Sequence, residues 1–180
     1  MNDRKILRTR AANWGVTLGV VLWVVSLISW KLRLEFEHPG VVNMLTTAAM
    51  AAVVWFSGMI NVNTKWEEPY TYGRSLSFIL MTSALAGVAW GVGTFTLSAW
   101  IAPEYYAELI NRQLDAMLLQ AKADDALIEM VDAMRGAGVK AMRNPFVCIL
   151  SGVMNLVMYG GMLGIVMAAL LRQKNVKENE

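Results

Sequence analysis

Ionisable side chains are absent from four long stretches of this sequence. Ala11–Trp30, Gly40–Ile60, Ser75–Ala102 and Pro145–Leu171 contain no Asp, Glu, Lys, Arg or His. A helix that crosses a bilayer needs about 20 apolar residues. A charge at the bilayer centre costs at least about 2.5 kcal/mol, so it persists there mainly where function requires it. The sequence therefore predicts an all-α integral membrane four-helix bundle without a proton or ion relay at mid-depth.

Cysteine and histidine are each present once, as Cys148 and His38. A single cysteine excludes an internal disulfide, and a single histidine leaves no nitrogen and sulfur cluster for a metal. Asp125, Glu129 and Asp132 share one helix face, but without a glycine-bearing calcium loop we interpret them as a solvated acidic face. We therefore predict no catalytic residue, no cofactor and no metal site. A net charge of +2 does not favour a nucleic-acid partner.

The length of the chain fits one domain, residues 1–180. Four spans place both termini on the same side of the membrane. That side carries nine of the sixteen basic residues, and both terminal flanks are basic. The positive-inside rule then predicts cytoplasmic termini, with residues 103–143 on the extracytoplasmic side.

Small residues recur at every fourth position in three of the predicted spans. Because lipid tails are as apolar as leucine, helices in a bilayer associate mainly where small residues let their backbones approach. The predicted packing residues are Gly15, Gly19, Ser83, Gly87, Gly91, Gly160, Gly164 and Ala168. We expect them to assemble the bundle. The alternative is that one stripe, that of the first span, faces a partner or a second copy.

Asn155 is the most polar residue well inside a predicted span, and Tyr159 follows one helical turn later. The pair predicts a hydrogen bond between helices, worth about 1 kcal/mol. Contact of Asn155 with a substrate is the alternative interpretation.

Residues 103–143 form the only sizeable aqueous segment, and their apolar residues recur at spacings of three and four. This pattern predicts two amphipathic helices, with Pro103 in the first turn of one and the Gly136–Gly138 pair ending the other. Because the segment has a net charge of −2, we expect its apolar face to pack on protein rather than to lie on anionic lipid. The candidate contact residues are Leu109, Met117, Ile128 and Val131.

The loop between the second and third predicted spans, residues 61–74, is rich in aromatic and charged residues. Its candidate lipid or partner contacts are Trp66, Tyr70, Tyr72, Gly73 and Arg74. Gly73 is a candidate for an unusual backbone angle. Arg74 is a candidate partner of a lipid phosphate or of Glu67 and Glu68. We favour an anchor at the membrane interface, with a docking surface for a cytoplasmic partner as the alternative.

Short motifs mark the ends of the last two spans in a characteristic order. Tyr72-Gly73-Arg74-Ser75 opens the third span, Pro103-Glu104 ends it, and Asn144-Pro145-Phe146 opens the fourth. In this order the motifs resemble a bacterial inner-membrane family known only as a domain of unknown function, family number 4199. Members commonly carry Phe and Lys at the positions of Tyr72 and Arg74. The resemblance implies an all-α fold in the inner membrane and brings no reaction and no catalytic residue.

Three functional hypotheses remain. We expect a non-enzymatic scaffold or accessory subunit, which assembles with itself or with a membrane-associated enzyme, such as one acting on envelope lipids or glycans. A small oligomeric transporter or channel-like protein is the alternative, although a proton-coupled exporter needs an ionisable group within a span. An integral-membrane enzyme would depend on loop carboxylates and His38. Membrane lipid is an expected partner under all three hypotheses.

Overall fold

The computed structural model describes residues 3–66, 69–120 and 125–171, and these residues form helices joined by short connections. In chain order the helices are α1 (Asp3–Lys31), α2 (Leu34–Glu37), α3 (Pro39–Val62), α4 (Tyr72–Thr96), the π-helix η1 (Leu97–Ile101), α5 (Pro103–Gln120), α6 (Asp125–Met142) and α7 (Pro145–Leu170). The helices α1, α3, α4 with η1, and α7 are long and apolar enough to cross a membrane. The predicted all-α membrane bundle with four spans is confirmed.

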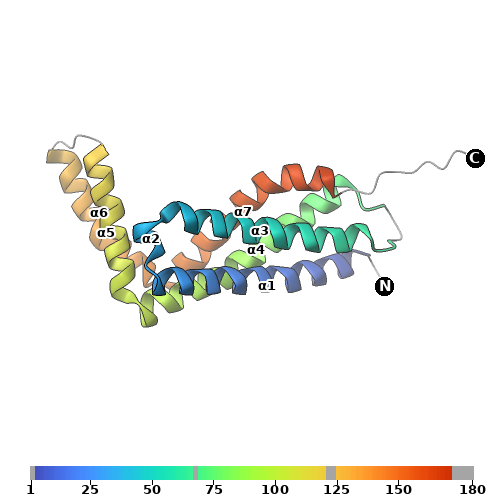
Figure 1. Ribbon diagram of the computed structural model, residues 1–180, viewed down its shortest axis with the longest axis horizontal. Helices are drawn as coiled ribbons and strands as arrows, with labels where there is room; N and C mark the ends of the chain where they lie inside the picture. The colour runs from blue at the N-terminus through green and yellow to red at the C-terminus, as the bar shows by residue number, and fades with distance from the viewer. Residues whose placement is uncertain (1–2, 67–68, 121–124, 172–180) are drawn as a thin grey trace, which may run out of the picture.

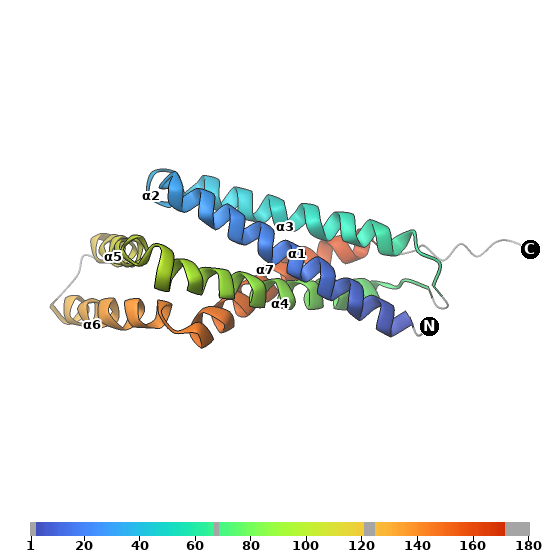
Figure 2. The ribbon, with the colours of Figure 1, turned by 90° about the horizontal axis from the view of Figure 1, so that it is seen from below.

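The four long helices run along an elongated bundle, with α5 and α6 as a hairpin at the end opposite the N-terminus (Figure 1). The helix α1 begins, and α7 ends, at the same end of the bundle. The central helix is α4, which packs most extensively against α7 and next against α1. Figure 2 shows α3 beside α1 at the edge of the bundle. Because α3 touches α4 and α7 only thinly, it is the most loosely held span.

Glycine allows the backbones of α4 and α7 to touch. A Cβ placed on Gly87 would lie 2.5 Å from Val153 Cα, and one on Gly91 would lie 2.6 Å from Ile149 Cα. Such distances are shorter than real side chains adopt, so only glycine fits at these two positions. The rest of this contact also uses predicted packing residues, since Ser83 lies against Gly160, while Gly164 lies near Leu76 and Ile79.

The stripe of small residues in the first span faces α4 of the same chain. A Cβ on Gly15 would lie 2.9 Å from Thr82 O, and one on Gly19 would lie 2.8 Å from Ala86 O. These glycines therefore serve the bundle itself and are not available to a second copy. Ala168 of α7 is likewise buried, in a cluster with Val54, Phe78 and Ile79.

The end of the hairpin where α5 begins packs on the adjoining ends of the membrane spans. Leu97, Ala102, Tyr105 and Tyr106 form a buried cluster with the side chains of Trp23, Leu27, Trp30 and Phe36. The hairpin itself is held by packing between α5 and α6. Arg135 of α6 also pairs with Asp115 of α5. Part of the predicted apolar face therefore covers the chain's own helix ends.

The second hairpin helix ends later than the sequence suggested. The helix α6 runs to Met142, so the prediction that Gly136–Gly138 end it is wrong. A glycine inside a helix costs only about 1 kcal/mol relative to alanine, and Gly138 also lies against Ile110 of α5. The packing between the two helices therefore outweighs the weak helix propensity of the glycines.

The start of the last span follows the prediction. The side-chain oxygen of Asn144 accepts hydrogen bonds from the N–H groups of Phe146, at 3.0 Å, and Val147, at 3.4 Å. Pro145 occupies the first turn, where its missing N–H costs nothing. Asn144 is thus the N-cap of α7.

Candidate functional site

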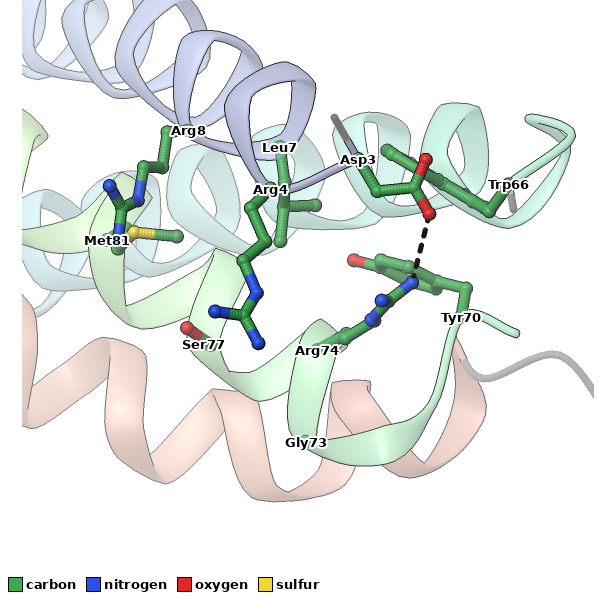
Figure 3. A pocket seen from close by; sticks show the side chains of 10 residues that line it. All are labelled: Asp3, Arg4, Leu7, Arg8, Trp66, Tyr70, Gly73, Arg74, Ser77 and Met81. Carbon is green, nitrogen blue, oxygen red and sulfur yellow. Dashed lines mark hydrogen bonds and ion pairs between the residues drawn. The ribbon is translucent and has the colours of Figure 1, made fainter. Parts of the chain in front are cut away.

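The helices α1 and α4 begin at the same end of the bundle. Their N-terminal turns and the connection that follows α3 line a pocket there. The pocket has a volume of about 390 Å³ and is shown in Figure 3; we call it the basic pocket. Its lining residues are Asp3, Arg4, Leu7, Arg8, Trp66, Tyr70, Gly73, Arg74, Ser77 and Met81. Because two helices begin here, the positive ends of two helix dipoles lie at the pocket.

Positive charge exceeds negative charge among the lining residues, which include three guanidinium groups and one carboxylate. Arg4 and Arg8 extend from α1 toward Ser77 and Met81 of α4 (Figure 3). Arg74 extends from α4, and its Nη1 donates to Asp3 Oδ2 at 3.4 Å. Arg8 makes no hydrogen bond or ion pair with another residue in the described part of the chain, so its guanidinium is available to a ligand.

An aromatic pair forms one wall of the basic pocket. The rings of Trp66 and Tyr70 are stacked, with centroids 5.9 Å apart. Trp66 is fixed from behind, because its Nε1 donates to Asn61 O at 2.7 Å and the guanidinium of Arg10 lies 5.5 Å from its ring centroid. Burial raises the pKa of Tyr70, so this side chain is a neutral phenol. The wall is therefore rigid and carries no negative charge.

The basic pocket brings together four of the five contact residues predicted in this loop, namely Trp66, Tyr70, Gly73 and Arg74. Tyr72 does not line it and is 37% exposed on the surface. No described glycine has a positive φ, so the predicted unusual backbone angle at Gly73 is wrong. Gly73 lies in the first turn of α4, with open space where a Cβ would stand. Glu67 and Glu68, the other predicted partners of Arg74, lie outside the described residues.

Sequence reasoning missed the contribution of α1 to this site. Arg4 and Arg8 are four residues apart and continue the helix face that carries Ala11 and Gly15. That face packs on α4, so the same spacing that predicted helix contact also places these two arginines in one pocket with Arg74. Extending the small-residue stripe toward the N-terminus would have found them.

A family model described as a protein of unknown function, DUF4199, matches residues 13–173. The chain belongs to the DUF4199 family. The resemblance inferred from the motifs of the third and fourth spans is thereby confirmed. No curated protein and no solved structure matches the chain. Most residues of the basic pocket lie within the matched range, while those contributed by the start of α1 precede it.

The hairpin residues predicted to contact a partner do not form one surface in the DUF4199 chain. Met117 is 54% exposed and Ile128 is 42% exposed, whereas Leu109 is half-buried. Val131 is 1% exposed, which removes it from the set that a partner can reach. Among the described residues, no three His, Cys, Asp or Glu side chains are grouped to hold a metal ion.

The hydrogen bond predicted between Asn155 or Tyr159 and another helix does not form among the described residues. Asn155 and Tyr159 are both exposed on α7, and neither forms a hydrogen bond with another residue that the structure describes. Their positions on α7 therefore leave two polar side chains available at the surface of a membrane span.

Proposed function

We propose that this protein is a non-catalytic membrane scaffold whose basic pocket binds the phosphate group of an anionic lipid. The observation that carries the proposal is the convergence of Arg4, Arg8 and Arg74, from two helices, on one pocket with an aromatic wall. Guanidinium groups bind phosphate oxygens through paired, charge-assisted hydrogen bonds. Tryptophan and tyrosine favour the depth of the lipid headgroups. The pocket thus offers both the charge and the depth that a lipid phosphate needs.

The distribution of basic residues supports an orientation. The basic N-terminal flank, which supplies Arg4 and Arg8 to the basic pocket, lies at this end of the bundle, so the positive-inside rule favours cytoplasmic termini. We propose a bacterial inner-membrane location on this ground and on the family resemblance. The hairpin of α5 and α6 then lies on the extracytoplasmic side.

The outer surface of the hairpin supports a role in assembly. Leu119 of α5 is 84% exposed, and methionines of both hairpin helices, among them Met117, Met130 and Met134, are also exposed. Exposed apolar side chains of this kind mark sites of protein contact. We propose that the hairpin contacts a second copy or a membrane-associated enzyme, such as one acting on envelope lipids or glycans, while the basic pocket fixes the scaffold to anionic lipid.

The test is lipid retention by the purified protein. The protein is extracted in mild detergent with equal amounts of phosphatidylglycerol and phosphatidylcholine, and bound lipid is counted by native mass spectrometry. A lost charge-assisted hydrogen bond costs about 1.5–3 kcal/mol, so Arg8→Gln is expected to reduce retained phosphatidylglycerol about tenfold or more. Lys5→Gln is the matched control, because Lys5 is exposed on the same helix and does not line the pocket.

Two outcomes would overturn the proposal. One is equal retention of the two lipids by the wild-type protein. The other is equal retention of phosphatidylglycerol by Arg8→Gln and Lys5→Gln. Inorganic phosphate is added as a competitor to distinguish a lipid phosphate from free phosphate as the ligand. Displacement of the lipid at millimolar phosphate would assign the pocket to free phosphate.

A further inference from the structure

A second cavity lies at the opposite end of the bundle, beside the loosely held helix α3. It has a volume of about 190 Å³, and α1, α2, α3, α4 and α7 all contribute to its lining. Its polar lining residues include Glu35, Asn43, Thr46, Thr47, Asn155 and Tyr159. Thr47 of α3 and Asn155 of α7 are exposed, so the cavity opens on the side of the bundle between these helices. We call it the lateral crevice.

The lateral crevice extends from the end of the spans into their middle. Glu35 lies in α2, in the connection before α3, whereas Met50 and Leu156 line the crevice near the centres of α3 and α7. A polar group in hydrocarbon needs a hydrogen-bond partner, and Asn155 finds none among the described residues. The crevice therefore offers polar groups at a depth where lipid is the only surrounding solvent.

Glu35 has no cationic partner in the part of the chain that the structure describes. Its Oε2 accepts a hydrogen bond from Tyr105 Oη at 3.2 Å, and within the described residues it forms no ion pair. The nearby Arg33 is engaged elsewhere, because its Nη2 lies 2.6 Å from Glu108 Oε2. Burial raises the pKa of Glu35, as expected for a carboxyl group that lacks a positive partner. A ligand that brings a cation to this point would supply the missing partner.

We propose that the lateral crevice binds the headgroup of a zwitterionic lipid that carries a primary ammonium. The ammonium donates to the carboxylate of Glu35, and the amides of Asn43 and Asn155 donate to the phosphate and ester oxygens. The acyl chains remain in the bilayer outside the opening between α3 and α7. The crevice, at about 190 Å³, is smaller than sites that enclose a whole drug-sized ligand, which have about 300–1,000 Å³. Its volume therefore suits a headgroup whose acyl chains stay outside.

The chemistry of the lining favours a primary ammonium over the other common headgroups. A quaternary ammonium has no N–H to donate to Glu35, and its recognition depends on aromatic faces that surround it. An anionic headgroup would place its charge beside the carboxylate. The proposed ligand therefore differs from that of the basic pocket, and the two sites are tested independently.

The experiment compares lipids with identical acyl chains and different headgroups. The full-length protein is purified in mild detergent with equal amounts of phosphatidylethanolamine, phosphatidylcholine and phosphatidylglycerol, and retained lipid is counted by native mass spectrometry. We expect about tenfold enrichment of phosphatidylethanolamine over phosphatidylcholine. Glu35→Gln should abolish this preference while keeping an oxygen that accepts from Tyr105. Glu37→Gln is the matched control, because Glu37 is exposed on α2 and does not line the crevice.

A second variant keeps the test decisive if Glu35→Gln does not fold. Asn155→Leu should lower the retention of phosphatidylethanolamine and phosphatidylcholine together, because both lipids share the phosphate and ester oxygens. Equal retention of these two lipids by the wild-type protein overturns the proposal, as does an unchanged preference in Glu35→Gln. Arg8→Gln should preserve the preference for phosphatidylethanolamine, so failure at the basic pocket and failure at the crevice give different results.

Discussion

Gly87→Ala tests the most demanding contact in the bundle. The added methyl group would lie 2.5 Å from Val153 Cα and 2.7 Å from Gly152 O, and both of these are backbone atoms of α7. Ordinary contacts begin at 3.4 Å, and real Cβ atoms essentially never approach within 3.0 Å. The backbone cannot turn aside as a flexible side chain would, so α4 and α7 must move apart where Gly87 meets Gly152 and Val153.

The expected magnitude follows from two opposing effects. Overpacking of a well-packed contact costs about 1–3 kcal/mol. Replacing glycine by alanine in a helix returns up to about 1 kcal/mol. Gly161→Ala in α7 gains the same helix propensity without the clash, because its Cβ would meet only Leu80 Cδ2, at 3.9 Å. The difference in free energy of unfolding between the two variants should therefore equal the overpacking cost alone, about 1–3 kcal/mol.

The measurement is unfolding in mixed micelles. Helix content is followed by circular dichroism while dodecyl sulfate is titrated into the mild detergent. The unfolding midpoints of Gly87→Ala and Gly161→Ala are then compared. Gly87→Leu should unfold at a lower dodecyl sulfate concentration than Gly87→Ala. If Gly87→Ala were as stable as Gly161→Ala, the close approach of α4 and α7 would not contribute to the stability of the bundle, and the packing argument would be refuted.

Three further outcomes are expected. Asn144→Ala should lower the free energy of unfolding by about 0.5–2 kcal/mol in the same titration, because the N–H groups of Phe146 and Val147 lose their acceptor. The folded state raises the pKa of Glu35 above its ordinary value of 4.5, so the wild-type melting temperature should fall as the pH rises from 4.5 through that raised value, and Glu35→Gln should lack this decline. A fluorescent protein fused after Glu180 should fluoresce in the cytoplasm, whereas activity of a periplasmic phosphatase fused there would reverse the proposed orientation.

The spans were predictable because charged side chains are excluded from the hydrocarbon of the bilayer. The absence of charge does not, however, locate the ends of the helices. The first apolar stretch begins at Ala11, whereas α1 begins at Asp3. Charged residues such as Arg4 and Arg8 are acceptable in a helix once it leaves the hydrocarbon. The third span, predicted to end at Ala102, continues from α4 through the π-helix Leu97–Ile101. Its length was therefore predictable, whereas its change of helix type was not.

The sites depend on which residues face each other, and sequence spacing does not specify that. The loop residues Trp66 and Arg74 were identifiable because aromatic and basic side chains at the end of a span suggest the membrane interface. Their partner Arg8 comes from α1 only because Gly15 brings α1 onto α4. Asn155 illustrates the opposite result, since its polarity predicted a partner on another helix and the packing of α7 left it exposed.

The distribution of close contacts explains where the crevice lies. The glycine contacts join α1, α4 and α7 into one tightly packed unit, and α3 is held mainly by α1. Movement of α3 away from α7 would therefore open the lateral crevice without disturbing the contact at Gly87. A mild disturbance of the contact between α4 and α7 should therefore leave headgroup selection intact. Gly87→Ala, though less stable, should retain the preference for phosphatidylethanolamine over phosphatidylcholine, and loss of that preference would show that the crevice depends on the contact between α4 and α7.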